Sequence, residues 1–306
     1  MSQKIKELNF RTDMADERVD TYKKYHNLTE IDGVKISTFS DEKISTTIVE
    51  VLNENGQKAV SKQIGKYITI QIDDIDCLEV EEEEKISSAL SKVLKELIGD
   101  EKEKSILVVG LGNEQVTPDS LGPKVAQNIE ITRHILNFAK ELATPDTREI
   151  SAISPGVLGT TGIETSEIVF SIVKKINASM VIVIDALASQ SISRIGNTVQ
   201  LSNTGITPGA GVRNKREGIN KETLGIPVIA IGVPTVVDMA TITNEAINKI
   251  LKDKKVELTQ EEESNRYETI ANILDTQNYI VTPKEIDEVV SIVAKIIAKG
   301  INISVQ

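Results

Sequence analysis

Two aspartates stand where acid–base chemistry on a water molecule would be placed in an α/β protein. Asp119 lies in the loop GLGNEQVTPDSLGP, which follows the apolar segment 105–109. Asp185 directly follows a second apolar segment, 180–184. In open parallel sheets, ligands bind in the crevice beyond the C-terminal ends of the strands. We therefore expect both carboxylates to lie in this crevice.

Two carboxylates that share a crevice cannot both ionise freely, because each negative charge raises the pKa of the other. One would keep its proton while the other activates water. The structural alternatives are that Asp119 caps the following helix and that Asp185 shapes a turn at the end of its strand. The small, largely neutral loop after Asp185 is not explained by these alternatives.

Other residues are candidates for supporting roles around the two aspartates. Asp238 follows the last apolar segment of the core and could lie behind the pair. Backbone N–H groups of the glycine-containing loops could stabilise an oxyanion, and the candidates are Gly156 and Gly162 in one loop and Gly209 and Gly211 in the other.

The segments around these residues alternate between strand and helix patterns. This alternation predicts a doubly wound α/β fold, in which a mostly parallel central sheet is flanked by helices. The expected strands are 105–109, 149–153, 180–184, 197–201 and 227–231, and the expected helices are 123–142, 164–176 and 240–251. We expect Asp185 to end its strand.

The segments on either side of this core carry different patterns. Residues 45–52 and 67–72 read as strands, and Asn55-Gly56 between them is typical of a hairpin turn, so we expect an N-terminal β-hairpin elaboration. The remaining expected elements are a helical segment at 16–26, a helix at 86–97 closed by Gly99, a charged insertion at 252–278 and a C-terminal helix at 283–299. The acidic run Glu81 to Glu84 is interpreted as a helix N-terminus rather than a patch for a basic partner.

Composition excludes several classes of protein. The 306 residues carry a formal net charge of −11, so the basic surface of a nucleic-acid-binding protein is missing. Cys77 is the only cysteine and there are two histidines, so we expect neither a thiolate metal site nor another metal or cofactor. The glycine pattern GLGNEQ lacks the third glycine of a dinucleotide site. No apolar stretch approaches 18 residues and no signal peptide is visible, which predicts a cytoplasmic protein without a membrane span.

Long motifs in one order along nearly the whole chain resemble the germination protease (spore protease) family of endospore-forming bacteria. They are RTDMADE (11–17), GLGNEQVTPDSLGP (110–123), PGVLGTTGIET (155–165), IDALA (184–188), NTGITPGAGVRNKR (203–216), IGVPTVVDM (231–239) and VTPKEID (281–287).

The resemblance implies an atypical aspartic endopeptidase with a core like that of hydrogenase-maturation proteases and with no cofactor. Its substrates would be small acid-soluble spore proteins, degraded at germination in the spore core. The family's catalytic aspartates fall on Asp119 and Asp185. The resemblance further implies a homotetramer that is made as an inactive precursor in the forespore and removes its own N-terminal segment.

The N-terminus resembles a substrate of the same family. Family substrates are cut after Glu in a motif like T-E-(F/I)-A-x-E, and residues 12–17 read TDMADE. This similarity predicts cleavage between Asp13 and Met14, which makes residues 1–13 a propeptide and 14–306 a single protease domain with an elaboration over about 14–100. A charged arm without a role is the alternative.

This chain departs from the family pattern at a few positions. Ser120 and Met239 stand where the family commonly has alanine, and Gln190 stands near a position that is often basic. The last change bears on specificity rather than on chemistry. Two other functions are open from the residues alone: a metal-assisted processing peptidase that resembles hydrogenase-maturation proteases, and a non-enzymatic module that binds small proteins.

Overall fold

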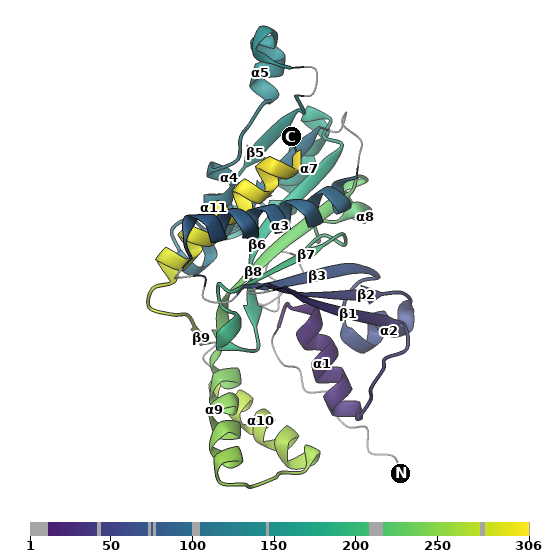
Figure 1. Cartoon of the computed structure of the whole chain (residues 1–306), viewed down its shortest axis with the longest axis vertical. Helices are drawn as coiled ribbons and strands as arrows, with labels where there is room; N and C mark the ends of the chain where they lie inside the picture. The colour runs from purple at the N-terminus through teal and green to yellow at the C-terminus, as the bar shows by residue number, and fades with distance from the viewer. Residues whose placement is uncertain are drawn as a thin grey trace.

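A computed structural model describes residues 12–41, 44–72, 75, 78–99, 105–144, 147–207, 217–275 and 279–305. The strands in these residues form one sheet in the order β1-β2-β3-β7-β8-β6-β4-β5, with β9 paired to β8 (Figure 1). Their bounds are β1 Val34–Asp41, β2 Ile44–Val51, β3 Gly65–Ile72, β4 Ile106–Gly110, β5 Ile150–Ile153, β6 Met180–Ser189, β7 Thr198–Ser202, β8 Val228–Asp238 and β9 Ile280–Val281.

Strands β8, β6, β4 and β5 run parallel and form the core of the sheet. Alternate side chains of these strands enter two separate clusters, one on each face of the sheet. Helices α3 (Val80–Ile98), α4 (Leu121–Gln127) and α11 (Ile286–Val305) cover one face, while α7 (Thr165–Ile176) and α8 (Lys221–Leu224) cover the other. The predicted doubly wound α/β fold is thus confirmed. Strands with both faces covered need nearly continuous apolar sequences, as these have.

The remaining strands are antiparallel, so the sheet as a whole is mixed. β3 pairs with β7, and β2 and β1 continue the sheet beyond β3. The N-terminal β elaboration is therefore an extension of the central sheet. The expected Asn55-Gly56 turn is wrong, because α2 (Glu54–Val60) joins β2 to β3. The Asn53 side chain accepts a hydrogen bond from the Gly56 N–H at 3.0 Å, which caps this helix instead of closing a two-residue turn.

One predicted helix is interrupted. The pattern over 123–142 predicts a continuous helix, whereas the chain forms α4, α5 (Arg133–Phe138) and the 3₁₀ turn η3 (Lys140–Leu142). The reason lies at Thr132, whose N–H donates to the Ile150 carbonyl at 3.0 Å and whose hydroxyl oxygen accepts from the Ile150 N–H at 2.9 Å. These bonds attach the chain to the start of β5, and a helix passing through Thr132 could not make them.

Two strands are longer than their apolar segments. The expectation that Asp185 ends its strand is wrong, since β6 continues to Ser189. β8 also continues, to Asp238, and the two strands stay paired from Asp185–Gly232 to Ser189–Val237 with a bulge between Leu187 and Ala188. Each extension provides the hydrogen-bonding partner of the other. Small and polar residues therefore remain in the strands after the apolar runs end.

The other expected helices form, although the C-terminal helix expected over 283–299 is α11, which begins at Ile286 and ends at Val305. α1 (Ala15–His26) lies below β1 to β3, and α9 (Met239–Asp253) and α10 (Gln260–Asp275) form a pair that projects from the body (Figure 1). The acidic run occupies the first turn of α3, where Glu79 and Glu82 form a capping box and Gly99 ends the helix. Within the described ranges, no helix combines the length and apolar character that a membrane crossing requires.

Candidate active site

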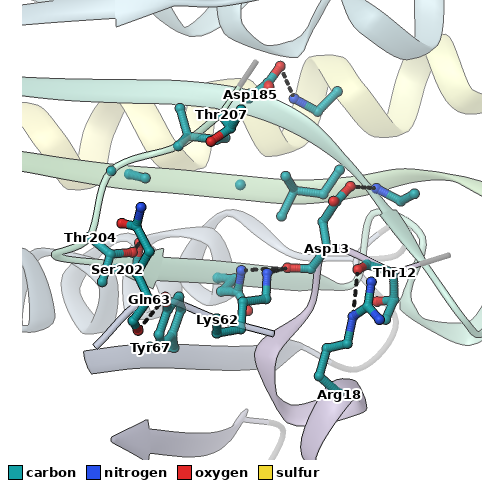
Figure 2. A pocket seen from close by; sticks show the side chains of 18 of the residues that line it. Thr12, Asp13, Arg18, Lys62, Gln63, Tyr67, Asp185, Ser202, Thr204 and Thr207 are labelled. Carbon is teal, nitrogen blue, oxygen red and sulfur yellow. Dashed lines mark hydrogen bonds between the residues drawn. The ribbon is translucent and has the colours of Figure 1, made fainter. Parts of the chain in front are cut away.

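A cavity of about 450 Å³ lies where the parallel strands meet the antiparallel extension, and both predicted aspartates line it. Its walls come from β3, β6, β7, β8 and the residues that precede α1. Figure 2 looks into this cavity, with Asp185 on one side and Thr12, Asp13 and Lys62 on the other. Both aspartates thus line one cavity, but β6 and β8 continue along it instead of ending before it, and Thr12 and Asp13 also line it.

Strand pairing brings the two aspartates together. β4 ends at Gly110 opposite Ile184, so Asp185 is the first residue of β6 beyond the end of β4. The Leu111 N–H continues this contact by donating to the Ile184 carbonyl at 2.8 Å. The chain then turns through the 3₁₀ helix η2 (Thr117–Asp119) and returns to the cavity at Asp119.

A close backbone approach holds Asp119 in place. Its carboxylate accepts a hydrogen bond from the Asn113 N–H at 2.7 Å. Gly112 has a φ of +114°, and a Cβ at this position would lie 2.0 Å from the Asp119 carbonyl oxygen. Only glycine adopts this conformation without strain and leaves this space. The GLG sequence thus serves a tight turn that holds Asp119 close to the end of β4.

The neighbours of Asp185 across the sheet are a glycine and a glutamine. Its neighbour across the ladder is Gly232, which has no side chain, and the next residue in the same row is Gln200 of β7. Leu187 fills the space over Gly232, since a Cβ there would lie 2.3 Å from a Leu187 methyl carbon. One carboxylate oxygen of Asp185 accepts the Ala186 N–H at 2.9 Å.

Both carboxyl groups hold a proton more tightly than an exposed aspartate does. Burial raises the pKa of Asp185 well above its ordinary value, and the nearby charges of Asp119 and Asp13 raise it further. Burial also raises the pKa of Asp119, while the Asn113 N–H partly offsets this effect. Such a pair favours one ionised and one protonated carboxyl group, which is the arrangement that water activation requires.

The other predicted positions lie away from this cavity or outside the described residues. Gly156 accepts a hydrogen bond from Thr165, and Gly162 ends the short helix α6 (Leu158–Thr161). The Asp238 carboxylate accepts from the Ala240 N–H at 2.8 Å and caps α9. Gly209 and Gly211 fall outside the described residues.

The N-terminal segment is bound through Asp13. Its N–H donates to the Ala188 carbonyl at 2.9 Å, and its side-chain carboxylate accepts from the Ala188 N–H, also at 2.9 Å. Its carbonyl oxygen turns away from β6 and accepts from the Lys62 ammonium at 2.6 Å and from the Gln200 side-chain amide at 3.2 Å. The following N–H, of Met14, donates to the Thr12 hydroxyl oxygen at 3.0 Å. The peptide bond predicted to be cleaved is therefore hydrogen-bonded at both ends.

Acidic residues that follow this peptide bond are fixed to the end of β6 and the loop after it. Glu17 accepts hydrogen bonds from the Thr12 hydroxyl and, at 2.8 Å, from the Gln190 N–H. Arg194 forms ion pairs with Asp16 at 2.6 Å and with Glu17 at 3.2 Å. Every polar residue of the TDMADE motif thus has a partner in the structure, and Met14 is fully buried.

Three of these partners were not predicted from the sequence: Lys62, Gln200 and Arg194. None lies in a motif whose spacing signals chemistry, and only the tertiary fold brings them to Asp13 and α1. Within the part of the chain that the structure describes, no cluster of three or more histidine, cysteine, aspartate or glutamate side chains is arranged to hold a metal ion.

Comparison with known proteins places this cavity in a family context. The sequence profile of the family described as germination protease matches residues 11–276. Curated germination proteases are similar over nearly the whole chain: one from Clostridium perfringens is 45% identical over 314 residues, which covers 97% of this chain and 95% of that protein. One from Caldanaerobacter subterraneus subsp. tengcongensis is 43% identical over 98% and 95% of the two chains. One from Priestia megaterium is 37% identical over 97% and 94%.

Among solved structures, a [NiFe] hydrogenase maturation protease HycI from Thermococcus kodakarensis KOD1 is similar to 60% of this chain and 97% of its own. The identity is 17% and the TM-score is 0.31, so this likeness supports no argument.

Proposed function

The chain belongs to the germination protease family and is therefore a peptidase, and from this premise we propose that it cleaves small acid-soluble spore proteins with a water molecule activated by Asp119 and Asp185. One observation carries the proposal. Both aspartates line one cavity, and that cavity already holds a stretch of the chain's own sequence that resembles a substrate.

The reaction needs only the two carboxyl groups and water. The ionised carboxylate takes a proton from water as the water oxygen bonds to the carbonyl carbon, and the protonated carboxyl gives its proton to the carbonyl oxygen. When the C–N bond breaks, one aspartate protonates the leaving nitrogen and the other takes the proton of the new carboxyl group. The pair then again shares one proton.

The proposal includes self-processing between Asp13 and Met14, which releases residues 1–13 as a propeptide. In the arrangement described above, Asp13 is anchored at Ala188, three residues beyond Asp185 on β6. At roughly 3.3 Å per residue this offset is about 10 Å along the strand. Thr12 and Asp13 therefore line the cavity while the peptide bond after Asp13 stays out of reach of Asp185, and cleavage requires the segment to slide along β6. This offset accounts for a silent precursor.

Other parts of the proposal come from the resemblance and from the family. We propose that the chain acts in the spore core after synthesis in the forespore, that it assembles as a homotetramer, and that residues 14–306 form one protease domain. Neither nucleic acid nor a membrane takes part. The two cationic residues that line the cavity, Lys62 and Arg18, suit substrates that carry acidic residues.

A digestion experiment tests the activity. A purified small acid-soluble protein is incubated with the parent chain, with Asp119→Asn, with Asp185→Asn and with Asp253→Asn, whose wild-type carboxylate is exposed at the end of α9. Fragments should appear with the parent and with Asp253→Asn, and their rate of formation should fall at least 1,000-fold in the other two. Retained cleavage in folded Asp185→Asn would remove that residue from the mechanism. Binding without fragments would favour a binding module, and loss of activity with a chelator would favour a metal-assisted peptidase.

A further inference from the structure

Asp13 is held by three groups from three separate strands or loops. The Ala188 N–H of β6 binds its carboxylate, and the Gln200 side chain of β7 binds its carbonyl oxygen. Lys62, in the loop between α2 and β3, also donates to that carbonyl oxygen. These groups are brought together only by the tertiary fold, so they form a site built around one residue of a polypeptide.

The charge of this site favours an acidic residue. Lys62 is partly buried and lies over the Tyr67 ring, with 5.8 Å between its ammonium nitrogen and the ring centre. Burial lowers the pKa of Lys62, and the negative charge of Asp13 opposes this effect. Arg18 is a second nearby cation whose pKa responds to the Asp13 charge. Removing the Asp13 carboxylate would take away a negative charge that offsets both of these partly buried cations, which is costly.

The backbone geometry explains why the Asp13 side chain takes part in the pairing with β6. In an antiparallel pairing the carbonyl oxygen of Asp13 would accept the Ala188 N–H. Here that carbonyl oxygen is turned to Lys62 and Gln200, and the carboxylate takes its place on Ala188. A residue without an acceptor in its side chain would leave the Ala188 N–H unpaired. An amide would satisfy this N–H but would supply no charge.

We propose that Lys62, Gln200 and the Ala188 N–H form a subsite that selects an acidic residue of a bound polypeptide. In this subsite Lys62 distinguishes a negatively charged side chain from a neutral one. The proposal rests on the proposed peptidase function and assigns the specificity of that same cavity. It predicts that, before cleavage, the acidic residue of a bound polypeptide lies at Ala188, three residues beyond Asp185 on β6, as Asp13 does. Substrates would first be recognised there and then moved to the aspartates.

The first test measures binding without catalysis. Hydrogen exchange of the 12–18 segment is followed in the full chain carrying Asp119→Asn, so that no processing occurs. Adding Lys62→Met or Asp13→Asn should speed exchange of the segment about tenfold or more, the scale of losing a charge-assisted hydrogen bond. The two changes combined should give less than the product of their separate effects, because each removes the attraction between the Lys62 ammonium and the Asp13 carboxylate. Lys62→Arg should keep much of the protection.

Lys66 provides a matched control for this test. It is four residues further on and pairs with the exposed Glu96 at 2.7 Å, outside the cavity. Lys66→Met should leave exchange of the 12–18 segment unchanged. If Lys62→Met also leaves it unchanged, or if the effects of Lys62→Met and Asp13→Asn simply multiply, the subsite is refuted. Thermal unfolding of each variant separates local release from loss of the fold.

The second test measures selection in cleavage. Peptides that carry TEFASE and TQFASE are given to the parent and to Lys62→Met, and kcat/KM is measured for each. The parent should prefer the glutamate peptide by about tenfold or more, and Lys62→Met should cut both at similar rates, chiefly through a higher KM for the glutamate peptide. An unchanged preference in Lys62→Met would overturn the proposal. If the parent cuts neither peptide, the proposed function fails, while the exchange experiment still decides the subsite.

Discussion

At the scale of single residues, the proton on the Asp119–Asp185 pair links activity to stability. The pKa of Asp185 is raised in the folded chain by burial, by Asp119 and by Asp13. A carboxyl group with a raised folded pKa binds its proton more tightly folded than unfolded. Its contribution therefore favours the folded state at low pH, and stability is lost as pH rises from the unfolded pKa, about 3.9, through the folded pKa.

Asp185→Asn should accordingly stabilise the chain near neutral pH while it abolishes cleavage. The expected gain in the free energy of unfolding is on the order of 1 kcal/mol, because the neutral amide avoids the free-energy cost of ionising a carboxyl group in a partly buried site. Denaturant unfolding at pH 7.5 and pH 4.5 checks this, with Asp253→Asn as the exposed control. The gain should shrink at the lower pH. A loss of stability at pH 7.5 would contradict the description of the pair.

The candidate site shows which residues can be predicted from sequence. Asp119 and Asp185 are identifiable as candidates because each follows an apolar segment of the core, and the structure places both in one cavity. Lys62 and Gln200 had no such signal. They reach Asp13 because β3 pairs with β7, a contact between strands separated by more than a hundred residues. Long-range pairing of this kind is not encoded in local periodicity.

At the scale of elements, the turn between β4 and α4 depends on Gly112. A side chain there would meet the Asp119 carbonyl oxygen at 2.0 Å and would also strain a φ of +114°. Gly112→Ala should therefore cost about 2 kcal/mol or more of stability and displace the Asp119 carboxylate. We expect cleavage to fall at least 100-fold in the fraction that remains folded.

Gly159 is a suitable control for that substitution. It lies in the short helix α6, and a Cβ there would meet nothing within 4 Å. Gly159→Ala should leave stability within about 0.5 kcal/mol of the parent, or raise it slightly, and should leave cleavage intact. Equal effects of the two changes on unfolding and activity would show that the Gly112 turn does not position Asp119.

The loop after β6 holds the start of α1 through Arg194. This side chain is 18% exposed and joins Asp16 and Glu17, which are 9% and 6% exposed. Arg194→Met should destabilise the docked segment by about 2 kcal/mol or more, because it leaves two partly buried carboxylates without their cation. A protease that cuts in 12–18 should act on this variant before the rest of the chain unfolds. Protection equal to that of the parent would exclude Arg194 as an anchor.

Element lengths were less predictable than element types. The apolar runs identified the parallel strands, but β6 and β8 extend past them because each supplies the other's hydrogen bonds. The helix expected over 123–142 is interrupted because Thr132 bonds to β5, a neighbour that is remote in sequence. In both cases a tertiary contact overrides the local pattern.

At the scale of the whole molecule, Thr12 and Asp13 line the cavity of their own chain. Self-processing should therefore be first order, with a rate constant that does not change when the protein concentration is varied a hundredfold. Intact mass measured over time at several concentrations checks this. A rate constant that rises in proportion to concentration would show that one copy cuts another.

The fold should survive the cut, because Ala15 and Val19 beyond the cleaved bond are buried in the cluster under β2 and β3.

The most direct test of the central claim is the intact mass of the parent, Asp119→Asn and Asp185→Asn, followed over time at mildly acidic pH. We predict that the parent loses the mass of residues 1–13, with Met14 as the new N-terminus, while both variants stay whole. This outcome would establish the self-processing and the role of both aspartates together. Loss of the same segment from either folded variant at the parent's rate would contradict the account.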